Sequence, residues 1–299
     1  MKRKLVKQGV ATMMISLPSK WVKEHHLEKG DEIELERIDN NLLISSKTVN
    51  KKTETELKLE RTDESEIRTL ITNAYRAGCD RVKVDFGDEK RFRQLNKIIK
   101  SNLIGFDIIK KEKDFCIVEN ITEPSENQFD NILKKMFLSI SELLEITEKR
   151  LTGSKEDYEE VEERIQKYDN FCRRVISKNR VLGKKSEFFW TFLSMLMHGQ
   201  REIYFLNEKL EQKTSISDKT KNLLGDVQEL FSLISNVYLK KDIKLLSKVR
   251  ELHKDAVYKK GQTLLQSKKG KENLILYHMI IAMRQFYHAN SPLFGLILK

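Results

Sequence analysis

Hydrophobic and polar residues follow three successive patterns along this chain of 299 residues. Residues 1–48 contain short runs of alternating apolar and polar positions, which are typical of β-strands. Residues 51–120 mix such runs with apolar positions at helical spacing, and from residue 124 onward the spacing is almost wholly helical. The pattern predicts a multidomain α+β protein. A small β-rich domain at 1–48 and a small α/β domain at 51–120 precede an all-α domain at 124–299.

The first segment predicts short strands around one short helix. Residues 11–17 form an apolar run, and residues 32–38 alternate strictly before a turn near Asp39-Asn40 and a last strand. The helix is expected to begin near Ser19, whose hydroxyl would cap free backbone N–H groups. A domain of this size without disulfides or metal seldom buries a core alone, so we expect a homodimer.

The middle segment predicts two helices and four strands. Apolar residues at helical spacing run from Ile67 to Tyr75, and this helix is expected to end at Gly78. A second helix carries Leu95 and Ile99. The expected strands contain Leu57 and Leu59, Val82 and Val84, residues 106–109 and residues 115–118. The last two should form a hairpin, and no phosphate-binding loop or dinucleotide fingerprint is present.

The remaining residues predict six helices in two sets of three. The breaks between them are expected near Gly153, Gly183, residues 213–217, Lys240 and residues 268–270. Residues 164–169 are similar to residues 250–255, which lie 86 positions later, and a pair of basic residues follows both segments at the same distance. This similarity predicts a helical bundle of two three-helix repeats, at about 124–212 and 217–299.

Positive charge exceeds negative charge and is concentrated at the amino terminus. The chain has 56 Lys and Arg residues against 45 Asp and Glu residues, a net charge of +11. This balance favours an anionic partner such as DNA, with a solvated basic surface as the alternative. Six basic residues of the first segment precede its first acidic residue, Glu24; they are Lys2, Arg3, Lys4, Lys7, Lys20 and Lys23. A two-fold axis would double them along the phosphates of a groove.

The cysteines and the lack of long apolar runs indicate in which cellular compartment the protein is expected. The three cysteines, Cys79, Cys116 and Cys172, are scattered and form no disulfide framework. The amino-terminal residues lack the long apolar stretch of a signal peptide, and no apolar run reaches about eighteen residues, so neither a signal peptide nor a membrane span is expected. We therefore expect a cytoplasmic protein without membrane insertion. No Ser/His/Asp, Cys/His or paired-carboxylate set stands at catalytic spacing, so no enzymatic activity is expected.

The first segment resembles the AbrB/MazE/SpoVT swapped-hairpin family. The resemblance lies in ATMMISLPSKW at residues 11–21, LEKGDEIELE at residues 27–36 and NNLLIS at residues 40–45. It implies that two chains interlace their hairpins into one dimeric β-barrel, and that basic residues of the amino-terminal strands and adjoining loops face DNA. Carried onto this sequence, the DNA-binding residues are Lys2, Arg3, Lys4, Lys7 and Lys20.

The whole arrangement resembles the PhoU-like phosphate uptake regulators of archaea. This resemblance implies a non-enzymatic regulator that acts on a phosphate ABC transporter ATPase or on a signalling partner. PhoU repeats commonly bind metal through acids four residues apart on one helical face. Here Ile165 precedes Asp169 at that spacing, and only Glu251 and Asp255 keep an acid pair. No cofactor is expected; a divalent or ferric ion at Asp169, Glu251 and Asp255 is the alternative.

Two arginines stand where the third helix of each repeat usually carries further acids. Arg201 and Arg284 occupy equivalent places in the two repeats. We expect them to neutralise Asp169 and Asp255 across helices, with a phosphate or ligand pocket as the alternative role. The sequence thus predicts a DNA-binding transcriptional regulator of phosphate uptake. The rivals are a protein-interaction regulator of a phosphate ABC transporter without direct DNA binding, and a metal-sensing helical protein.

Overall fold

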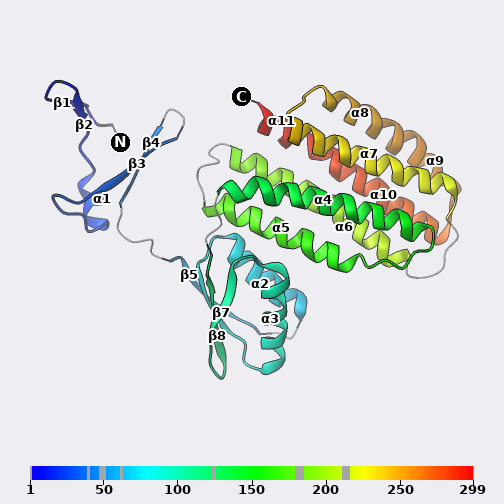
Figure 1. The fold of residues 1–299 in the computed structure, drawn as a ribbon, viewed down its shortest axis with the longest axis horizontal. Helices are drawn as coiled ribbons and strands as arrows, with labels where there is room; N and C mark the ends of the chain where they lie inside the picture. Colours follow the sequence, from blue (N-terminus) through cyan, green and yellow to red (C-terminus); the bar gives the residue numbers. More distant parts are fainter. Residues whose placement is uncertain are drawn as a thin grey trace. The chain divides into compact units, whose positions relative to one another are not determined.

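The computed structural model describes residues 2–38, 41–46, 52–60, 63–122, 126–178, 185–210 and 216–298. The chain divides into two compact units, Met1–Lys52 and Thr53–Lys299 (Figure 1). The turn expected at Asp39-Asn40, the expected start at residue 124 and the break expected near Gly183 lie outside the described residues. None of the helices in the described ranges is long and apolar enough to cross a membrane.

The amino-terminal unit contains two β-hairpins and one short helix. Its elements are β1 (Val6–Gln8), β2 (Thr12–Met14), α1 (Ser19–Glu24), β3 (Ile33–Ile38) and β4 (Asn41–Ser46). The first hairpin turns at Gly9, whose φ of +71° favours glycine. Ser19 is the first helical residue and Pro18 holds the capping position, without a side-chain hydrogen bond. The prediction that Ser19 caps the helix was therefore wrong.

One chain does not close a barrel from the described residues of this unit. β1 and β2 form one two-stranded sheet, and β3 and β4 form another. None of the residues between 2 and 46 whose burial is described is fully buried. Two-stranded hairpins have too little apolar surface to build a core by themselves. The described strands of one chain therefore form two separate hairpins and not the closed barrel expected from the sequence.

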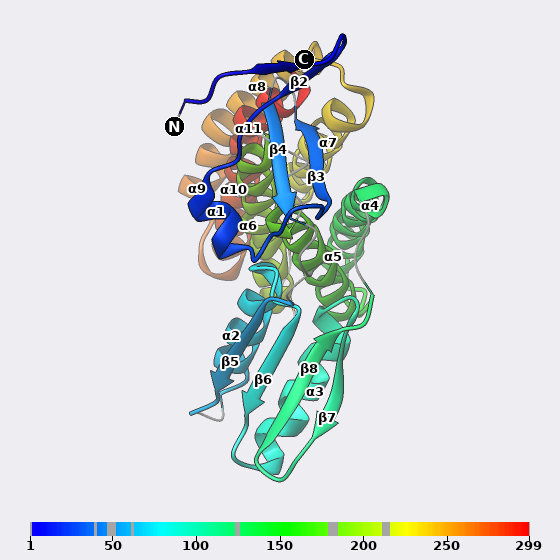
Figure 2. The same cartoon turned by 90° about the vertical axis from the view of Figure 1, so that its left-hand side faces the viewer.

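The second unit begins with a four-stranded sheet covered by two helices. Its strands are β5 (Glu54–Lys58), β6 (Arg81–Asp85), β7 (Phe106–Lys111) and β8 (Phe115–Asn120). They lie in the order β5-β6-β8-β7, with β5 parallel to β6 and the other neighbours antiparallel. α2 (Glu64–Arg76) and α3 (Glu89–Asn102) lie behind the sheet in Figure 2. The two predicted helices, the strands and the β7-β8 hairpin are confirmed.

Local sequence explains where these elements begin and how they pack. Asp63 caps α2 by accepting a hydrogen bond from the Ser65 backbone, and Gly78 follows the helix at a φ of +88°. Val82 and Val84 alternate with exposed residues along β6, so both side chains enter the core between sheet and helices. The apolar positions that the sequence spaces along this strand are thus the ones buried in the core of the α/β domain.

The rest of the unit is helical. Its helices are α4 (Glu126–Leu151), α5 (Glu159–Lys178), α6 (Ser186–Leu210), α7 (Asp218–Lys240), α8 (Leu245–Asp255), α9 (Gln262–Ser267), α10 (Gly270–His288) and α11 (Asn290–Ile297). A π-helical segment, Ala256–Gly261, joins α8 to α9, so the fifth predicted helix is continuous but locally widened. These helices share one apolar core. Figure 1 shows them as a bundle.

α5 is the helix against which the α/β domain packs. The Asn170 side chain donates a hydrogen bond to the Asn102 carbonyl at 2.9 Å. Arg76, in the last turn of α2, reaches Asn170 Oδ1 through its Nε at 2.7 Å. The carboxyl-terminal parts of α2 and α3 are therefore tied to the middle of α5, and α6 lies beside α5 in the bundle.

Candidate functional site

The basic residues expected to contact DNA lie mainly on and before β1. Four of them form what we call the basic arm: Lys2, Arg3, Lys4 and Lys7. All four residues are exposed, and none forms an ion pair with a described residue. Lys20 lies on α1, and its Nζ is 3.8 Å from a Glu24 carboxylate oxygen. The positive charge of the basic arm is therefore open to an anionic partner, whereas the charge of Lys20 is partly balanced.

One face of the β3-β4 hairpin carries exposed leucines, together with Arg37. Leu35 pairs with Ile44, and Arg37 pairs with Leu42, so the Leu35 and Leu42 side chains lie on the same face. Leu35 is 62% exposed and Leu42 is 70% exposed. The residues around β1 and β2 also expose apolar side chains, those of Leu5, Val6, Val10, Met13, Met14 and Ile15. The unit thus exposes apolar side chains on both of its hairpins.

Asp169 is held by arginines, but not by the one expected from the sequence. It is 1% exposed, and its Oδ2 accepts hydrogen bonds from Arg173 Nε at 2.8 Å and from Arg76 Nη2 at 3.0 Å. Arg173 stands one helical turn further along α5, and Arg76 comes from α2. The expected pairing of Arg201 with Asp169 was therefore wrong, because a nearer cation on the same helical face already occupies the carboxylate.

The acids of the second half are arranged differently. Asp255, at the end of α8, forms ion pairs with Lys259 at 3.2 Å and Lys260 at 3.5 Å, so its expected pairing with Arg284 was also wrong. Glu251 is exposed on α8. Within the described ranges, no group of three or more His, Cys, Asp or Glu residues is arranged to hold a metal ion. The three candidate metal ligands Asp169, Glu251 and Asp255 thus do not form such a group.

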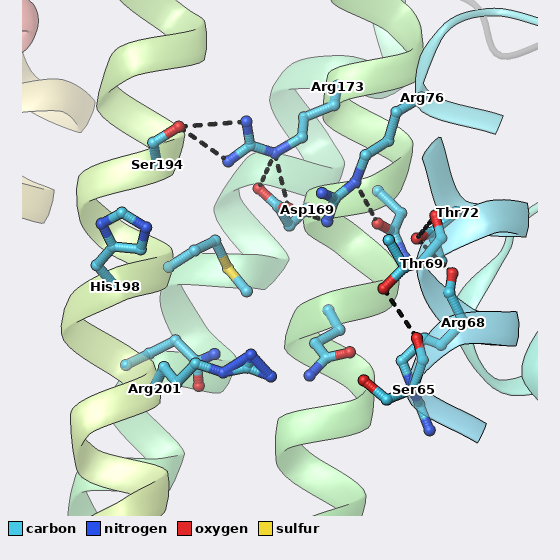
Figure 3. Close-up of a pocket in the computed structure, with 14 residues that line it drawn as sticks. Ser65, Arg68, Thr69, Thr72, Arg76, Asp169, Arg173, Ser194, His198 and Arg201 are labelled. Atoms are coloured by element: carbon cyan, nitrogen blue, oxygen red, sulfur yellow. Dashed lines mark hydrogen bonds and ion pairs between the residues drawn. The ribbon is translucent and has the colours of Figure 1, made fainter. Parts of the chain in front are cut away.

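A cavity of about 390 Å³ lies between α2, α5 and α6 (Figure 3). Its lining is mostly polar and includes Ser65, Arg68, Thr69, Thr72, Arg76, Gln166, Asp169, Asn170, Arg173, Ser194, Met197, His198, Gln200 and Arg201. In Figure 3, Arg201 extends from α6 toward the side chains of α2, and His198 stands on α6 between Ser194 and Arg201. We call this space the arginine cavity.

The geometry of the arginine cavity leaves positive charge in excess. Four arginines and one aspartate line it. Burial lowers the pKa of the Arg76 guanidinium; the Asp169 carboxylate opposes this shift, and the neighbouring Arg173 charge adds to it. Arg173 also donates to Ser194 Oγ at 3.3 Å and lies 4.7 Å from the centre of the Trp190 ring. These contacts fix two guanidinium groups at one end of the cavity.

Only part of this cavity could be predicted from the sequence. The sequence predicts a ligand pocket as the alternative role of Arg201, whereas it assigns no role to the polar side chains of α2. Their signal is a polar stripe at helical spacing, Ser65, Thr69, Thr72 and Arg76, on the side of α2 away from its apolar positions. The partner of that stripe could not be identified from sequence, because Arg76 and Asp169 are 93 residues apart.

Comparison with known proteins identifies a class for the amino-terminal unit. Residues 11–52 match the family described as antidote-toxin recognition MazE, bacterial antitoxin. The chain therefore carries an amino-terminal domain of the MazE/AbrB type, which supports the swapped-hairpin, DNA-binding character expected for this unit. No curated protein and no solved structure matches the chain. The basic arm directly precedes the matched residues.

Proposed function

We propose that this chain is a homodimeric, non-enzymatic regulator of transcription that binds DNA through its amino-terminal unit. One observation carries the proposal: a MazE/AbrB-type domain is preceded by four exposed cations that no described acid neutralises. Uncompensated lysines and arginines contact phosphates, and the release of counterions from the DNA supplies much of the binding free energy. A regulator of this kind acts at the chromosome, in the cytoplasm.

Dimerisation is part of the proposal. The open face that carries Leu35 and Leu42, and the exposed side chains around β1 and β2, would be covered when two chains interlace their hairpins. A two-fold axis would place two basic arms on one duplex, so the preferred DNA site should consist of two inverted half-sites.

The regulated process that we favour is phosphate uptake, with a PhoU-like helical body. The similar segments 164–169 and 250–255 fall on α5 and α8, each the second helical segment of its half. This correspondence supports two three-helix repeats. A phosphate ABC transporter ATPase or a signalling partner would then bind the helical body. That contact would depend on how much phosphate is available and would change the DNA binding of the amino-terminal unit.

Binding of duplex DNA, followed by fluorescence anisotropy at fixed salt, tests the proposal. The variant with Lys2, Arg3, Lys4 and Lys7 changed to Ala should lose at least tenfold in affinity. The matched control removes four exposed lysines of the helical body, Lys219→Ala, Lys240→Ala, Lys244→Ala and Lys248→Ala, and changes net charge equally. It should bind like the unaltered chain. Equal losses in both variants would mean that net charge alone attracts DNA.

Failure of the unaltered chain to bind any duplex would favour the alternative function. The amino-terminal unit would then serve dimerisation, and the helical body would regulate a phosphate ABC transporter by protein contact. Co-purification of the full chain with a transporter ATPase, unaffected by changes to the basic arm, would support that alternative.

A further inference from the structure

The arginine cavity has no part in the proposed contact with DNA, because all its lining residues belong to the second unit. Its lining nevertheless has the composition of an anion site. Arg68, Arg76, Arg173 and Arg201 bring four guanidinium groups to a space lined by a single carboxylate, that of Asp169. Serine and threonine hydroxyls from α2 add further hydrogen-bonding groups. Guanidinium groups present planar pairs of donors that match phosphate oxygens.

The hydrogen bonds within the cavity show where the free positive charge lies. Asp169 accepts from both Arg76 and Arg173, so one carboxylate faces two cations. The Arg68 guanidinium already donates hydrogen bonds of 2.7 Å to Glu64 Oε1 and of 2.7 Å to Asn102 Oδ1. Arg201 is exposed and donates no hydrogen bond to a described residue. Two guanidinium groups against one carboxylate, at the end of the cavity formed by Arg76 and Arg173, therefore leave positive charge that an incoming anion would neutralise. Arg201, further along α6, adds a third cation to the lining.

An adjoining cavity restricts how a ligand can enter. It shares Ser65, Arg68, Gln166 and Arg201 with the arginine cavity, but its other lining residues include the acids Glu64, Glu159, Glu162 and Glu163. These carboxylates repel a second anionic group. A ligand would therefore place its negative charge toward Arg76 and Arg173 and keep any uncharged or hydrogen-bond-donating part toward the acids.

We propose that the arginine cavity binds a small, multiply charged phosphate-bearing anion. Its volume of about 390 Å³ falls within the range of small-molecule sites and exceeds the size of a single phosphate ion. The ligand would touch α2 of the α/β domain together with α5 and α6 of the bundle. Its binding would consequently strengthen the contact between the α/β domain and the helical bundle. The ligand would thereby favour the conformation in which these two domains are in contact.

Isothermal titration calorimetry on the full chain tests the site with three probes: inorganic phosphate, pyrophosphate and ATP. Sodium chloride of matched ionic strength controls for screening. Arg201→Gln is the informative variant, since Arg201 is exposed and its removal breaks no hydrogen bond to a described residue. Arg284→Gln is the matched control, because Arg284 occupies the equivalent place in the second half, is also exposed and lies outside the cavity.

We expect at least one probe to bind, with a dissociation constant raised at least tenfold by Arg201→Gln and unchanged by Arg284→Gln. Hydrogen exchange along α2 should slow on binding. Tightest binding of inorganic phosphate would identify the free ion as the ligand, whereas tighter binding of pyrophosphate or ATP would identify a phosphorylated metabolite. Absence of binding by all three probes, or equal losses in both variants, would overturn the proposal. These results are independent of DNA binding by the amino-terminal unit.

Discussion

The guanidinium group of Arg174, which is 0% exposed, donates a hydrogen bond of 2.9 Å from Nη2 to Asp80 Oδ1. Its Nη1 donates to the backbone carbonyls of Tyr75 at 3.0 Å and Cys79 at 2.7 Å. Arg174 belongs to α5, and its three partners belong to the α/β domain. This buried cluster joins the sheet domain to the helical bundle and fixes the end of α2, the helix that forms one wall of the arginine cavity.

Removal of the Asp80 carboxylate should destabilise this junction. Asp80→Ala leaves the Arg174 charge buried without its carboxylate partner, which typically costs about 3 kcal/mol or more. Urea unfolding followed by circular dichroism measures the change. Asp85→Ala is the control, at an exposed position at the end of β6, the strand that begins directly after Asp80, and should change the free energy of unfolding by no more than about 0.5 kcal/mol. Equal effects of the two substitutions would contradict a structural role for the pair.

Close packing of α6 against α10 depends on Gly199. A Cβ atom at this position would lie 2.4 Å from the Phe286 ring, so Gly199→Ala must displace the ring or the helix. We expect a loss of about 1–3 kcal/mol in the free energy of unfolding. Gly225 in α7 is the matched control, because nothing lies within 4 Å of its added Cβ. Gly225→Ala should stabilise the chain by about 0.5–1 kcal/mol. Opposite signs in thermal unfolding would confirm the packing.

His253 should make stability depend on pH. The His253 ring stacks on Tyr287 with centroids 3.9 Å apart. Burial, with the charges of His288 and Arg284, lowers the pKa of His253 from 6.5 to about 4. Between these values the unfolded chain binds a proton that the folded chain does not, so stability falls as the pH drops from about 6.5 toward 4. His253→Phe retains the stack and should flatten this part of the urea-unfolding profile. A profile unchanged by the substitution would contradict the assignment.

The face of β3-β4 that carries Leu35 should be needed for dimerisation. Leu35→Asp places a charge among side chains that would be buried between two chains, so the dimer dissociation constant should rise at least tenfold. Analytical ultracentrifugation over a range of concentrations measures it. Glu34→Ala changes the opposite face of the same strand and should leave the mass unchanged. A Leu35→Asp chain that remains dimeric at all concentrations would place the dimer contact elsewhere.

The spacing of apolar residues predicted most helices and strands correctly, but it did not predict which side chains contact one another across them. The spacing of Ile67 and Tyr75 located α2 because a helix buries one face regardless of what covers it. The partners of Asp169 differ from the predicted Arg201, because Arg173 and Arg76 hold the carboxylate. Arg173 lies four residues further along α5, a spacing that the sequence itself displays, whereas Arg76 reaches Asp169 only because the α/β domain packs on α5.

Two further differences have local causes. The sequence near Ser19 contains a good capping residue, but Pro18 takes the capping position, so the serine begins the helix. The fifth predicted helix widens into a π-helical segment around Gly261, where an added Cβ would meet the Ala256 carbonyl at 2.9 Å. Helical periodicity alone does not reveal such a bulge, because the apolar spacing continues through it.

The dependence of DNA affinity on salt tests the central claim most directly. The dissociation constant of the full chain for a duplex should rise steeply with salt concentration, giving a log–log slope set by how many phosphates the protein neutralises. With Lys2, Arg3, Lys4 and Lys7 changed to Ala, that slope should become shallower by about 0.9 for each phosphate that the variant no longer neutralises. A slope unchanged by these four substitutions would show that the basic arm does not touch DNA, and would contradict the proposed function.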